Sequence, residues 1–339
     1  MMRHFKPYEA AVRHGGGLRA AAHAYPDAPK PWLDLSTGIN PVPWTGVRAP
    51  DESLNALPDP VDILELERLA GGTFGIGPER VCAVSGAETA IRMMPLILGP
   101  STVDIMEPTY GAHKESWRVS SMAPHAISKD QALNSGAGVL VIVNPNNPDG
   151  HLFDRDTLIK LARKRDRLGQ WLIIDESFIG CALHASIADQ NIEHLIVLRS
   201  FGKFFGLAGL RLGFMVAHPK LKAKMRGLTG DWPISTEAMV IGRSAYADQA
   251  WQSQTALRLK QDSQALDQAL ITAGFEIMGG TTLFRLVRSD LAQVWFEHLC
   301  QHGILTRPFD YAPDTLRFGV PTSETLPRLI KALEAGPCR

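Results

Sequence analysis

The sequence predicts an α/β fold in which a mostly parallel sheet is covered by helices, followed by a smaller α+β domain. From about residue 80 to residue 217, short apolar runs alternate with helical patterns. Continuous Val/Ile/Leu runs between helices are typical of parallel strands that are buried on both faces. After Gly274 the strands are shorter and the regular alternation has ended, which indicates a second, smaller domain.

The elements of the large domain follow one another in a regular order. Its predicted strands are residues 81–84, 103–106, 138–143, 171–174, 195–198 and 212–216. The predicted helices include one that ends near Gly99, an amphipathic stretch over 111–119 and a helix over 155–168. A long helical pattern from Ser235 to about Thr272 then ends the alternation.

The rest of the chain predicts the small domain. Its expected strands are residues 283–287, 304–306 and 316–318, and its expected helices lie near 291–301 and 323–334. The N-terminal segment is rich in proline, has no sustained period and is expected to pack against the small domain. We therefore expect an N-terminal segment (1–50), a large domain (51–230), and a connecting helix with the small domain (231–339).

Composition excludes several classes of protein. With 339 residues, of which 45% are hydrophobic, the chain is long enough for two domains. Lys+Arg and Asp+Glu are equal at 35 each, so no net charge favours nucleic acid or an anionic membrane surface. The four cysteines have no CxxC spacing and are expected to be reduced thiols. Without a signal peptide or a long apolar run, the expected location is the cytoplasm.

The most informative segment is Ser200-Phe-Gly-Lys-Phe-Phe-Gly-Leu-Ala-Gly-Leu-Arg-Leu-Gly213. Lys203 lies between two apolar runs, where desolvation would lower the pKa of its amine and favour Schiff-base chemistry with an aldehyde. Ser200 and Arg211 supply a hydroxyl and a fork-shaped cation, which suit a phosphate. An aldehyde that carries a phosphate suggests pyridoxal 5′-phosphate (PLP). The alternative is a lysine at a strand end whose amine simply reaches water.

Other candidates follow the strand ends, where ligands of doubly wound sheets bind. Ser85-Gly-Ala-Glu-Thr-Ala90 opens a helix whose backbone N–H groups could bind a phosphate, although Ser85 could also be an ordinary N-cap. Tyr110, in Glu107-Pro-Thr-Tyr110, could stack on a planar ring or pack in a turn.

Two polar residues follow the next strands. Asn147, in Asn144-Pro-Asn-Asn-Pro148, could donate a hydrogen bond to a phenolate oxygen. Asp175 follows a buried apolar run, and a protonated pyridine nitrogen would explain a carboxylate there. An exposed carboxylate at a strand end is the alternative. Together these strand-end features each match a different part of one cofactor.

In order and spacing, these segments resemble the fold-type-I PLP enzymes of the class I and II aminotransferase group, over nearly the whole chain. The resemblance implies a seven-stranded, mostly parallel sheet and a homodimer. It implies that Lys203 is the catalytic residue and binds PLP covalently. The other implied contacts are Asp175 with the pyridinium, Asn147 with the ring O3′, Tyr110 with the ring face, and Ala87, Glu88 (through its backbone), Ser200 and Arg211 with the phosphate. Arg317 matches the arginine that binds the substrate's anionic group.

Two positions depart from the aminotransferase pattern. Phe178 stands where a tyrosine usually hydrogen-bonds O3′, and Leu57 stands where a tyrosine often reaches the partner subunit's phosphate site. The first departure removes a hydroxyl that would help to tune the bond between the lysine and the cofactor. The second leaves undetermined which residues contact the cofactor phosphate across the dimer.

The N-terminal segment narrows the family further. His14-Gly-Gly-Gly-Leu18 and Leu33-Asp-Leu-Ser-Thr-Gly-Ile-Asn-Pro41 resemble the L-threonine-O-3-phosphate decarboxylases of cobalamin biosynthesis, which also carry Phe at the position of Phe178. This resemblance implies a small phosphorylated amino-acid substrate, contacted by His14, Asn40, Arg307 and Arg317. By themselves, the glycines would be interpreted as a flexible arm and the histidine as an exposed imidazole.

Two other functions and a metal site are alternatives to this assignment. An aminotransferase of a phosphorylated substrate such as histidinol phosphate is the main alternative. A catalytically idle module of a DNA-binding regulator is disfavoured, because no basic helix-turn-helix precedes the fold and Lys203 is present. His298 and His302 have metal-ligand spacing, but neither HExxH nor an obvious third ligand accompanies them, so no metal is expected.

Overall fold

A computed structural model describes residues 15–337, which form two compact units. Unit 2 comprises Pro43–Asn147 and His151–Ser253, and unit 1 comprises the chain before Pro43, Pro148–Gly150 and the chain from Gln254 onward. The domain boundaries expected at residues 50 and 230 both fall within unit 2 and stay a prediction.

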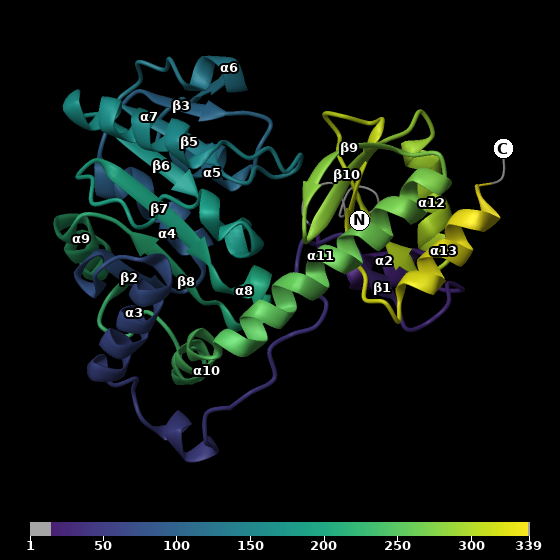
Figure 1. The fold of residues 1–339 in the computed structure, drawn as a ribbon, viewed down its shortest axis with the longest axis horizontal. Helices are drawn as coiled ribbons and strands as arrows, with labels where there is room; N and C mark the ends of the chain where they lie inside the picture. The colour runs from purple at the N-terminus through teal and green to yellow at the C-terminus, as the bar shows by residue number, and fades with distance from the viewer. Residues whose placement is uncertain (1–14, 338–339) are drawn as a thin grey trace, which may run out of the picture. The chain divides into compact units, whose positions relative to one another are not determined.

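Unit 2 contains a seven-stranded sheet with the strand order β2-β8-β7-β6-β5-β3-β4 (Figure 1). The strands are β2 (Val81–Val84), β3 (Val103–Met106), β4 (His125–Ile127), β5 (Val139–Val143), β6 (Trp171–Asp175), β7 (Leu195–Ser200) and β8 (Gly213–Val216). Only β8 pairs antiparallel with its neighbours, β2 and β7. The predicted mostly parallel sheet is therefore confirmed, and β4 is a strand that the sequence pattern did not indicate.

Helices cover this sheet and place residues at its carboxyl edge. They are α3 (Pro60–Phe74), α4 (Ala87–Leu98), α5 (Ala112–Val119), α6 (Lys129–Ala132), α7 (Arg155–Arg167), α8 (Phe201–Phe204), α9 (Pro219–Thr229) and α10 (Thr236–Ala247). Side chains from α4, α5 and α9 share one apolar core with alternate residues of the strands. Since α4 follows β2 and α8 follows β7 directly, both helices begin at strand ends.

The long helical pattern over 235–272 forms two helices rather than one. Helix α10 ends at Ala247, and α11 (Gln249–Thr272) begins after the single residue Asp248. The Asp248 backbone leaves the helical region, with φ −85° and ψ 73°, and its Oδ1 accepts a hydrogen bond of 3.0 Å from the backbone N–H of Trp251. An aspartate that caps the following turn favours a helix start, which explains the break.

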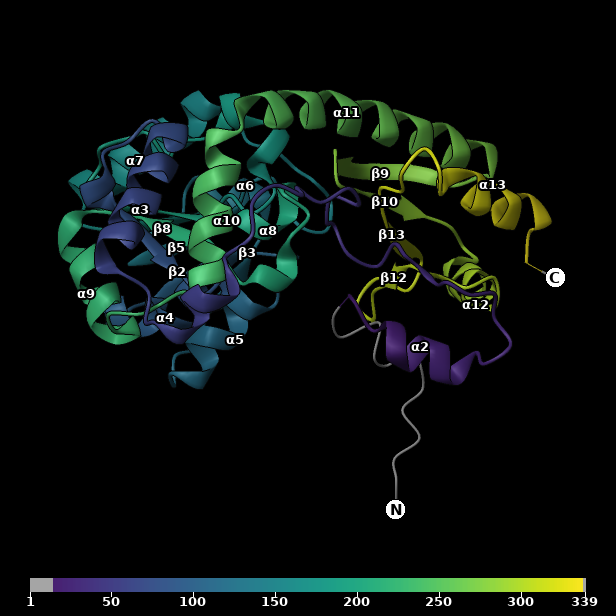
Figure 2. The ribbon, with the colours of Figure 1, turned by 90° about the horizontal axis from the view of Figure 1, so that it is seen from below.

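Unit 1 contains the later part of α11, a four-stranded antiparallel sheet and a two-stranded parallel one. The larger sheet has the order β12 (Arg307–Pro308), β13 (Thr315–Gly319), β10 (Phe284–Arg288) and β9 (Glu276–Thr281). The other helices of unit 1 are α2 (Leu18–Ala24), α12 (Ala292–Gln301) and α13 (Leu326–Ala335). Leucines of α11 and α13 belong to one buried core, and Figure 2 shows the two helices side by side.

The N-terminal segment contributes a strand to unit 1. Strand β1 (Leu33–Asp34) pairs in parallel with β11 (Ile304–Leu305), and Leu33 lies opposite Ile304. Gly319 then donates a backbone hydrogen bond of 2.6 Å to Leu35, so the segment continues beside β13. Every helix in the described part of the chain is too short or too polar to cross a membrane.

Candidate functional site

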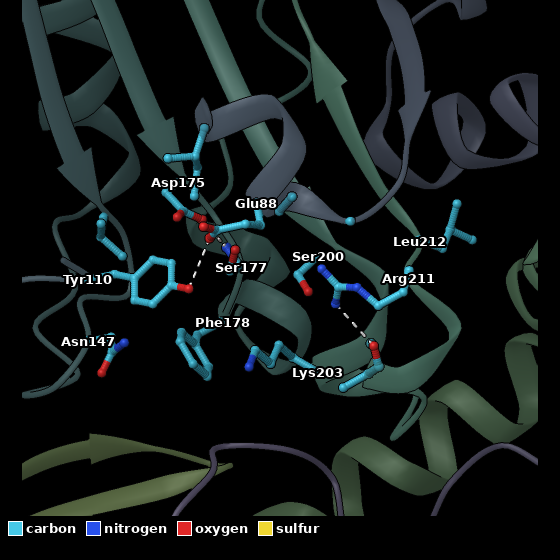
Figure 3. A pocket seen from close by; sticks show the side chains of 16 residues that line it. Glu88, Tyr110, Asn147, Asp175, Ser177, Phe178, Ser200, Lys203, Arg211 and Leu212 are labelled. Carbon is cyan, nitrogen blue, oxygen red and sulfur yellow. Dashed lines mark hydrogen bonds between the residues drawn. The ribbon is translucent and has the colours of Figure 1, made fainter. Parts of the chain in front are cut away.

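A pocket of about 150 Å³ lies within unit 2 (Figure 3). All eight residues that the sequence assigned to the cofactor line it, namely Ala87, Glu88, Tyr110, Asn147, Asp175, Ser200, Lys203 and Arg211. Seven of them directly follow or end β2, β3, β5, β6 and β7, whereas Arg211 comes just before the antiparallel strand β8. Gly86, Ile91, Val143, Ser177, Phe178, Gly202, Ala208 and Leu212 complete the lining.

One side of the pocket is suited to a phosphate. Gly86 has φ +84°, a conformation that favours glycine, and a Cβ there would lie 2.7 Å from Nη2 of Arg211, so the glycine leaves room for the guanidinium beside the backbone. At Gly213, a Cβ would collide with the backbone nitrogen of Ala87, the first residue of α4. The helix N-terminus and a guanidinium thus share a cradle that side chains would fill. These residues fit the phosphate of PLP.

Arg211 is held in an uncommon backbone conformation. Its φ is +58°, and Ser121 is the other non-glycine residue with positive φ in the described chain. Its Nη1 donates a hydrogen bond of 3.2 Å to the carbonyl of Ala208. Left-handed conformations of bulky residues are uncommon and cluster at functional sites, which agrees with a binding role for this guanidinium.

Asp175 is a buried carboxylate, with 2% of its surface exposed. Its Oδ2 lies 2.9 Å from Nε2 of His113, and its Oδ1 accepts a hydrogen bond of 2.9 Å from the backbone N–H of Ser177. Burial by itself raises the pKa of Asp175, but the hydrogen bonds and the charge of His113 outweigh it and leave the pKa below its usual value. The carboxylate therefore stays ionised at neutral pH and fits a pyridinium partner.

His113 is a site residue that sequence reasoning missed. It is 2% exposed and lies in the first turn of α5, three residues after Tyr110. The amphipathic stretch over 111–119 was predicted, but only the fold brings the imidazole to Asp175. A histidine on the buried face of a helix that follows a strand end was the available signal.

Lys203 lies in the single turn of α8, next to Ser200 at the end of β7. Its Nζ is 5.5 Å from the ring centroid of Phe178. The close turn depends on Gly202, because a Cβ there would lie 2.5 Å from Cα of Ala208. At the position of the usual tyrosine, the amine therefore has an aromatic ring beside it rather than a hydroxyl.

Tyr110 is fixed by a chain of polar contacts. Its hydroxyl donates a hydrogen bond of 2.9 Å to Oε2 of Glu88, and Oε1 of Glu88 lies 2.8 Å from Nε of Arg92. Arg92 also pairs with Glu115 at 2.7 Å. Burial, and then the charge of Glu88, raise the pKa of the Tyr110 phenol, so it remains a hydrogen-bond donor.

The Glu88 carboxylate therefore has a role beyond the backbone contact expected from the sequence. We expect Glu88→Ala to weaken PLP binding about tenfold, because the Tyr110 ring loses the charge-assisted hydrogen bond that orients it. Glu88→Gln should weaken binding less, since the amide oxygen still accepts from the hydroxyl. Fluorescence titration of the cofactor-free protein measures the dissociation constant. Glu115→Ala, which removes the distal partner of Arg92, is the matched control. Equal affinities in Glu88→Ala and the wild type would contradict this role.

Unit 1 holds a pair of arginines on adjacent strands. Arg307 of β12 lies opposite Arg317 of β13 in the antiparallel register. Arg317 is 4% exposed, and its Nη2 donates a hydrogen bond of 3.0 Å to the carbonyl of Ser36. Burial, and then the charge of Arg307, lower the pKa of Arg317 to about 9. A bound anion would offset both effects, so the pair is a candidate anion site.

Three of the four residues that are expected to contact the substrate lie in the described part of the chain. Asn40, Arg307 and Arg317 belong to unit 1, and the buried Asn40 is 2% exposed. His14 lies outside the described residues.

Comparison with known proteins identifies relatives across the whole fold. Residues 32–333 match the family model "Aminotransferase class I and II". The threonine-phosphate decarboxylase of Pseudomonas aeruginosa is 36% identical over 317 residues, which cover 92% of this chain and 94% of that protein. The histidinol-phosphate aminotransferase of Pectobacterium atrosepticum is 28% identical, with 99% of this chain and 96% of that protein covered.

Solved structures share the fold at lower sequence identity. A putative histidinol-phosphate aminotransferase from Erwinia carotovora atroseptica superimposes with a TM-score of 0.80 at 19% identity, covering 90% of this chain and 95% of that chain. The L-threonine-O-3-phosphate decarboxylase of Porphyromonas gingivalis gives a TM-score of 0.75 at 18% identity, covering 89% and 98%. The predicted fold type is therefore confirmed.

Proposed function

Because the chain belongs to the family of class I and II aminotransferases, we propose that it is a PLP-dependent enzyme that decarboxylates L-threonine O-3-phosphate. The products would be (R)-1-amino-2-propanol O-2-phosphate and CO₂. Sequence identity supports this substrate more strongly than histidinol phosphate, at 36% against 28%. The main observation behind the proposal is that one pocket is lined by Lys203, by Asp175 and by the phosphate cradle of Gly86 and Arg211.

When bound, PLP withdraws the electron pair that a bond broken at the substrate Cα leaves behind. Lys203 would hold the cofactor covalently and later return a proton to Cα. Asp175 would keep the pyridine nitrogen protonated, and Asn147 would donate to the ring O3′. Ser200, Arg211 and the N-terminus of α4 would bind the cofactor phosphate.

The choice between decarboxylation and amino transfer depends on how the substrate is held. Aminotransferases fix the substrate carboxylate in the plane of the cofactor ring, usually with the C-terminal arginine, so that the Cα–H bond breaks. We infer that Arg317 and Arg307 bind the substrate phosphate instead, by charge-assisted hydrogen bonds. The carboxylate is then able to turn perpendicular to the ring, and orientation selects the loss of CO₂.

The test is to offer the purified enzyme threonine phosphate and, separately, histidinol phosphate with 2-oxoglutarate. We expect CO₂ release from the first and no glutamate formation from the second. Arg317→Gln should lower kcat/KM for threonine phosphate about 100-fold or more, because the phosphate loses a buried cation. Glutamate formation without CO₂ release would identify an aminotransferase. The position in cobalamin biosynthesis implied by the sequence resemblance depends on this result.

We also propose that the enzyme is a homodimer. In unit 2, Leu57, Val61 and Leu64 are 66%, 71% and 57% exposed. Their spacing places Val61 and Leu64 on one face of the first turns of α3, with Leu57 just before it. Exposed apolar clusters of this kind mark interaction surfaces. A second copy of the chain is the occupant that the family resemblance implies, and two-fold dimers are the commonest oligomers.

Sedimentation of the wild-type enzyme should give the mass of a dimer. The double substitution Leu57→Asp with Val61→Asp should shift it to a monomer, because charges would be buried at the interface. Leu168→Asp is the control, since Leu168 is also exposed (62%) but lies at the end of α7. A wild-type enzyme that sediments as a fully active monomer would refute the dimer.

A further inference from the structure

We propose that Arg258 is a positioning residue that fixes the side-chain amide of Asn40, so that Asn40 acts as a hydrogen-bond donor toward the anionic substrate. The inference rests on the proposed function and deepens it, because it names a determinant of substrate affinity that the sequence did not suggest. All of the residues involved belong to unit 1.

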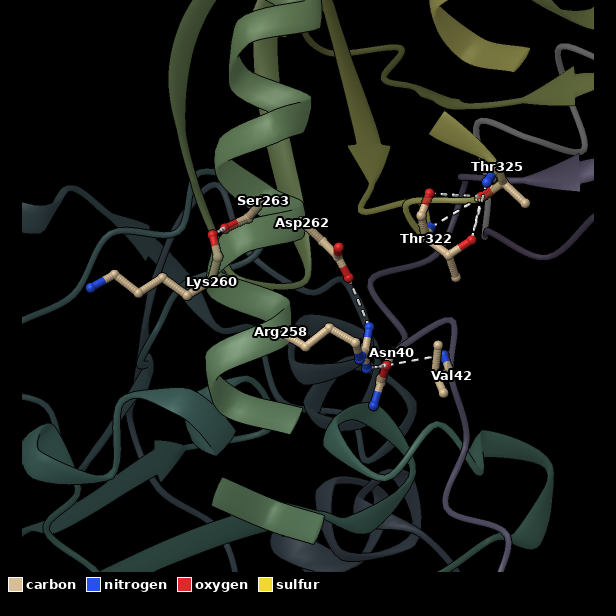
Figure 4. Close-up of polar contacts among 8 residues, drawn as sticks. All are labelled: Asn40, Val42, Arg258, Lys260, Asp262, Ser263, Thr322 and Thr325. Carbon is tan, nitrogen blue, oxygen red and sulfur yellow. Dashed lines mark hydrogen bonds and ion pairs between the residues drawn. The ribbon is translucent and has the colours of Figure 1, made fainter. Parts of the chain in front are cut away.

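The amide oxygen of Asn40 accepts hydrogen bonds from two groups that only donate. Nη2 of Arg258 donates to Oδ1 at 2.6 Å, and the backbone N–H of Val42 donates to the same atom at 3.1 Å (Figure 4). Asn40 itself is 2% exposed. Since neither a guanidinium nor an amide N–H accepts hydrogen bonds, these two contacts determine which end of the carboxamide is the oxygen.

Arg258 is in turn held by a carboxylate on its own helix. Its Nη1 lies 2.8 Å from Oδ2 of Asp262, four residues later on α11, and the Asp262 side chain is 10% exposed. The guanidinium therefore has one nitrogen on Asp262 and another on Asn40. This arrangement fixes the cation and offsets its charge, so Arg258 is suited to orienting Asn40 rather than to binding an anion directly.

The orientation has a chemical consequence for every other contact of Asn40. A rotation of the amide by 180° would place Nδ2 against two donors, Arg258 and the Val42 N–H. With Oδ1 already accepting two hydrogen bonds, the remaining polar group of the side chain is the Nδ2 amino group. Any contact that the side chain makes through Nδ2 is therefore made as a donor.

A donor at this position agrees with the proposal that Arg307 and Arg317 of unit 1 bind an anion. The segment that leads to Asn40 runs beside β13: Arg317 donates to the carbonyl of Ser36 at 3.0 Å, and Gly319 donates to that of Leu35 at 2.6 Å. Asn40 follows Ser36 by four residues. A phosphate or carboxylate presents only acceptors, so a fixed N–H donor is favourable and a second oxygen is repulsive.

Substitutions at two positions separate this role from a structural one. Asn40→Asp keeps an oxygen for Arg258 and Val42 but replaces the Nδ2 donor with a charged acceptor. Arg258→Gln removes the cation that holds the amide, and Arg258→Lys restores a charged donor. Arg285→Gln is the matched control, because Arg285 also pairs with a carboxylate of α11, Asp267, at 2.5 Å.

We expect Asn40→Asp to raise KM for threonine phosphate about tenfold or more with a smaller change in kcat, and to leave the melting temperature of the holoenzyme unchanged. Arg258→Gln should raise KM several-fold, Arg258→Lys should recover part of the loss, and Arg285→Gln should leave KM unchanged. Calorimetry with inorganic phosphate as the probe, on the same holoenzymes, should show the same order of affinities.

The outcomes distinguish this inference from the proposed function. If the wild type releases CO₂ but Asn40→Asp and Arg258→Gln keep KM and phosphate affinity within twofold, Asn40 is only a turn residue and the inference is wrong. If the wild type does not release CO₂, the proposed function fails, and the phosphate affinities of the same variants still decide the role of Arg258.

Discussion

Replacing Lys203 with alanine should lower CO₂ release from threonine phosphate by about 1000-fold or more, since the substitution removes the nucleophile and the proton donor together. The Nζ atom lies beside Phe178 in the pocket that contains Asp175, Asn147 and Arg211. The methyl group of alanine leaves the turn of α8 intact but cannot bond to an aldehyde. The protein should therefore still fold and bind PLP non-covalently.

Borohydride reduction and peptide mass spectrometry measure this directly. The wild-type protein should be yellow, lose that absorbance on reduction and retain the label on the peptide that contains Lys203. Lys220 is an exposed lysine in the first turn of α9, and Lys220→Ala is the control, which should behave as the wild type. A colourless wild-type protein that PLP cannot reconstitute, or a label on another lysine, would overturn the assignment of Lys203.

Replacing Asp175 with asparagine should reduce turnover about 100-fold or more, because the substitution removes the fixed charge that stabilises a protonated pyridine nitrogen. The amide keeps the shape of the carboxylate and can still accept from the Ser177 N–H and bond to His113. Since the pKa of Asp175 lies below its usual value, the wild-type group is charged throughout the neutral range and activity there does not depend on its titration. Asp175→Ala should lose most activity as well.

The absorbance spectrum and the amount of PLP retained by Asp175→Asn show whether turnover falls because the chemistry is impaired or because the cofactor is lost. We expect the cofactor to remain bound while turnover falls. Asp166→Asn is the matched control, because Asp166 pairs with His194 at 2.8 Å in the same unit but outside the pocket. If Asp175→Asn keeps activity within a few-fold of the wild type, the carboxylate has only a structural role.

Sequence reasoning located the strands of unit 2 well because a buried parallel strand has an unmistakable composition. Val139–Val143 is apolar at every position and buried at every position. The same reasoning merged α10 with α11, because Asp248 is compatible with a helical period and only its hydrogen bond to Trp251 ends the pattern. Strand β9, with two glycines, has no strong strand signal of its own.

Site residues could be predicted from the sequence where they lie at the end of a strand. They could not be predicted where their role depends on a side-chain contact with a residue distant in sequence. All eight cofactor residues line the pocket, and each either follows or ends a strand or, in the case of Arg211, comes just before the antiparallel strand β8. His113, the Glu88 carboxylate and Arg258 act through side chains that meet partners 62, 22 and 218 residues away. Local spacing carries no information about such partners, since they depend on how helices dock on the sheet.

Because β1 pairs with β11, unit 1 can be completed only after both ends of its chain have been synthesised, whereas unit 2 can fold earlier. Leu33 leaves the ribosome about 270 residues before Ile304, its partner in the parallel ladder, which is roughly 14–54 s at about 5–20 residues per second. The whole of unit 2 comes from the chain between these strands, so it can fold during that interval. Until β11 has been synthesised, the apolar residues around Leu33 lack the strand with which they pair. We therefore expect a chaperone to bind the nascent chain at its N-terminal segment.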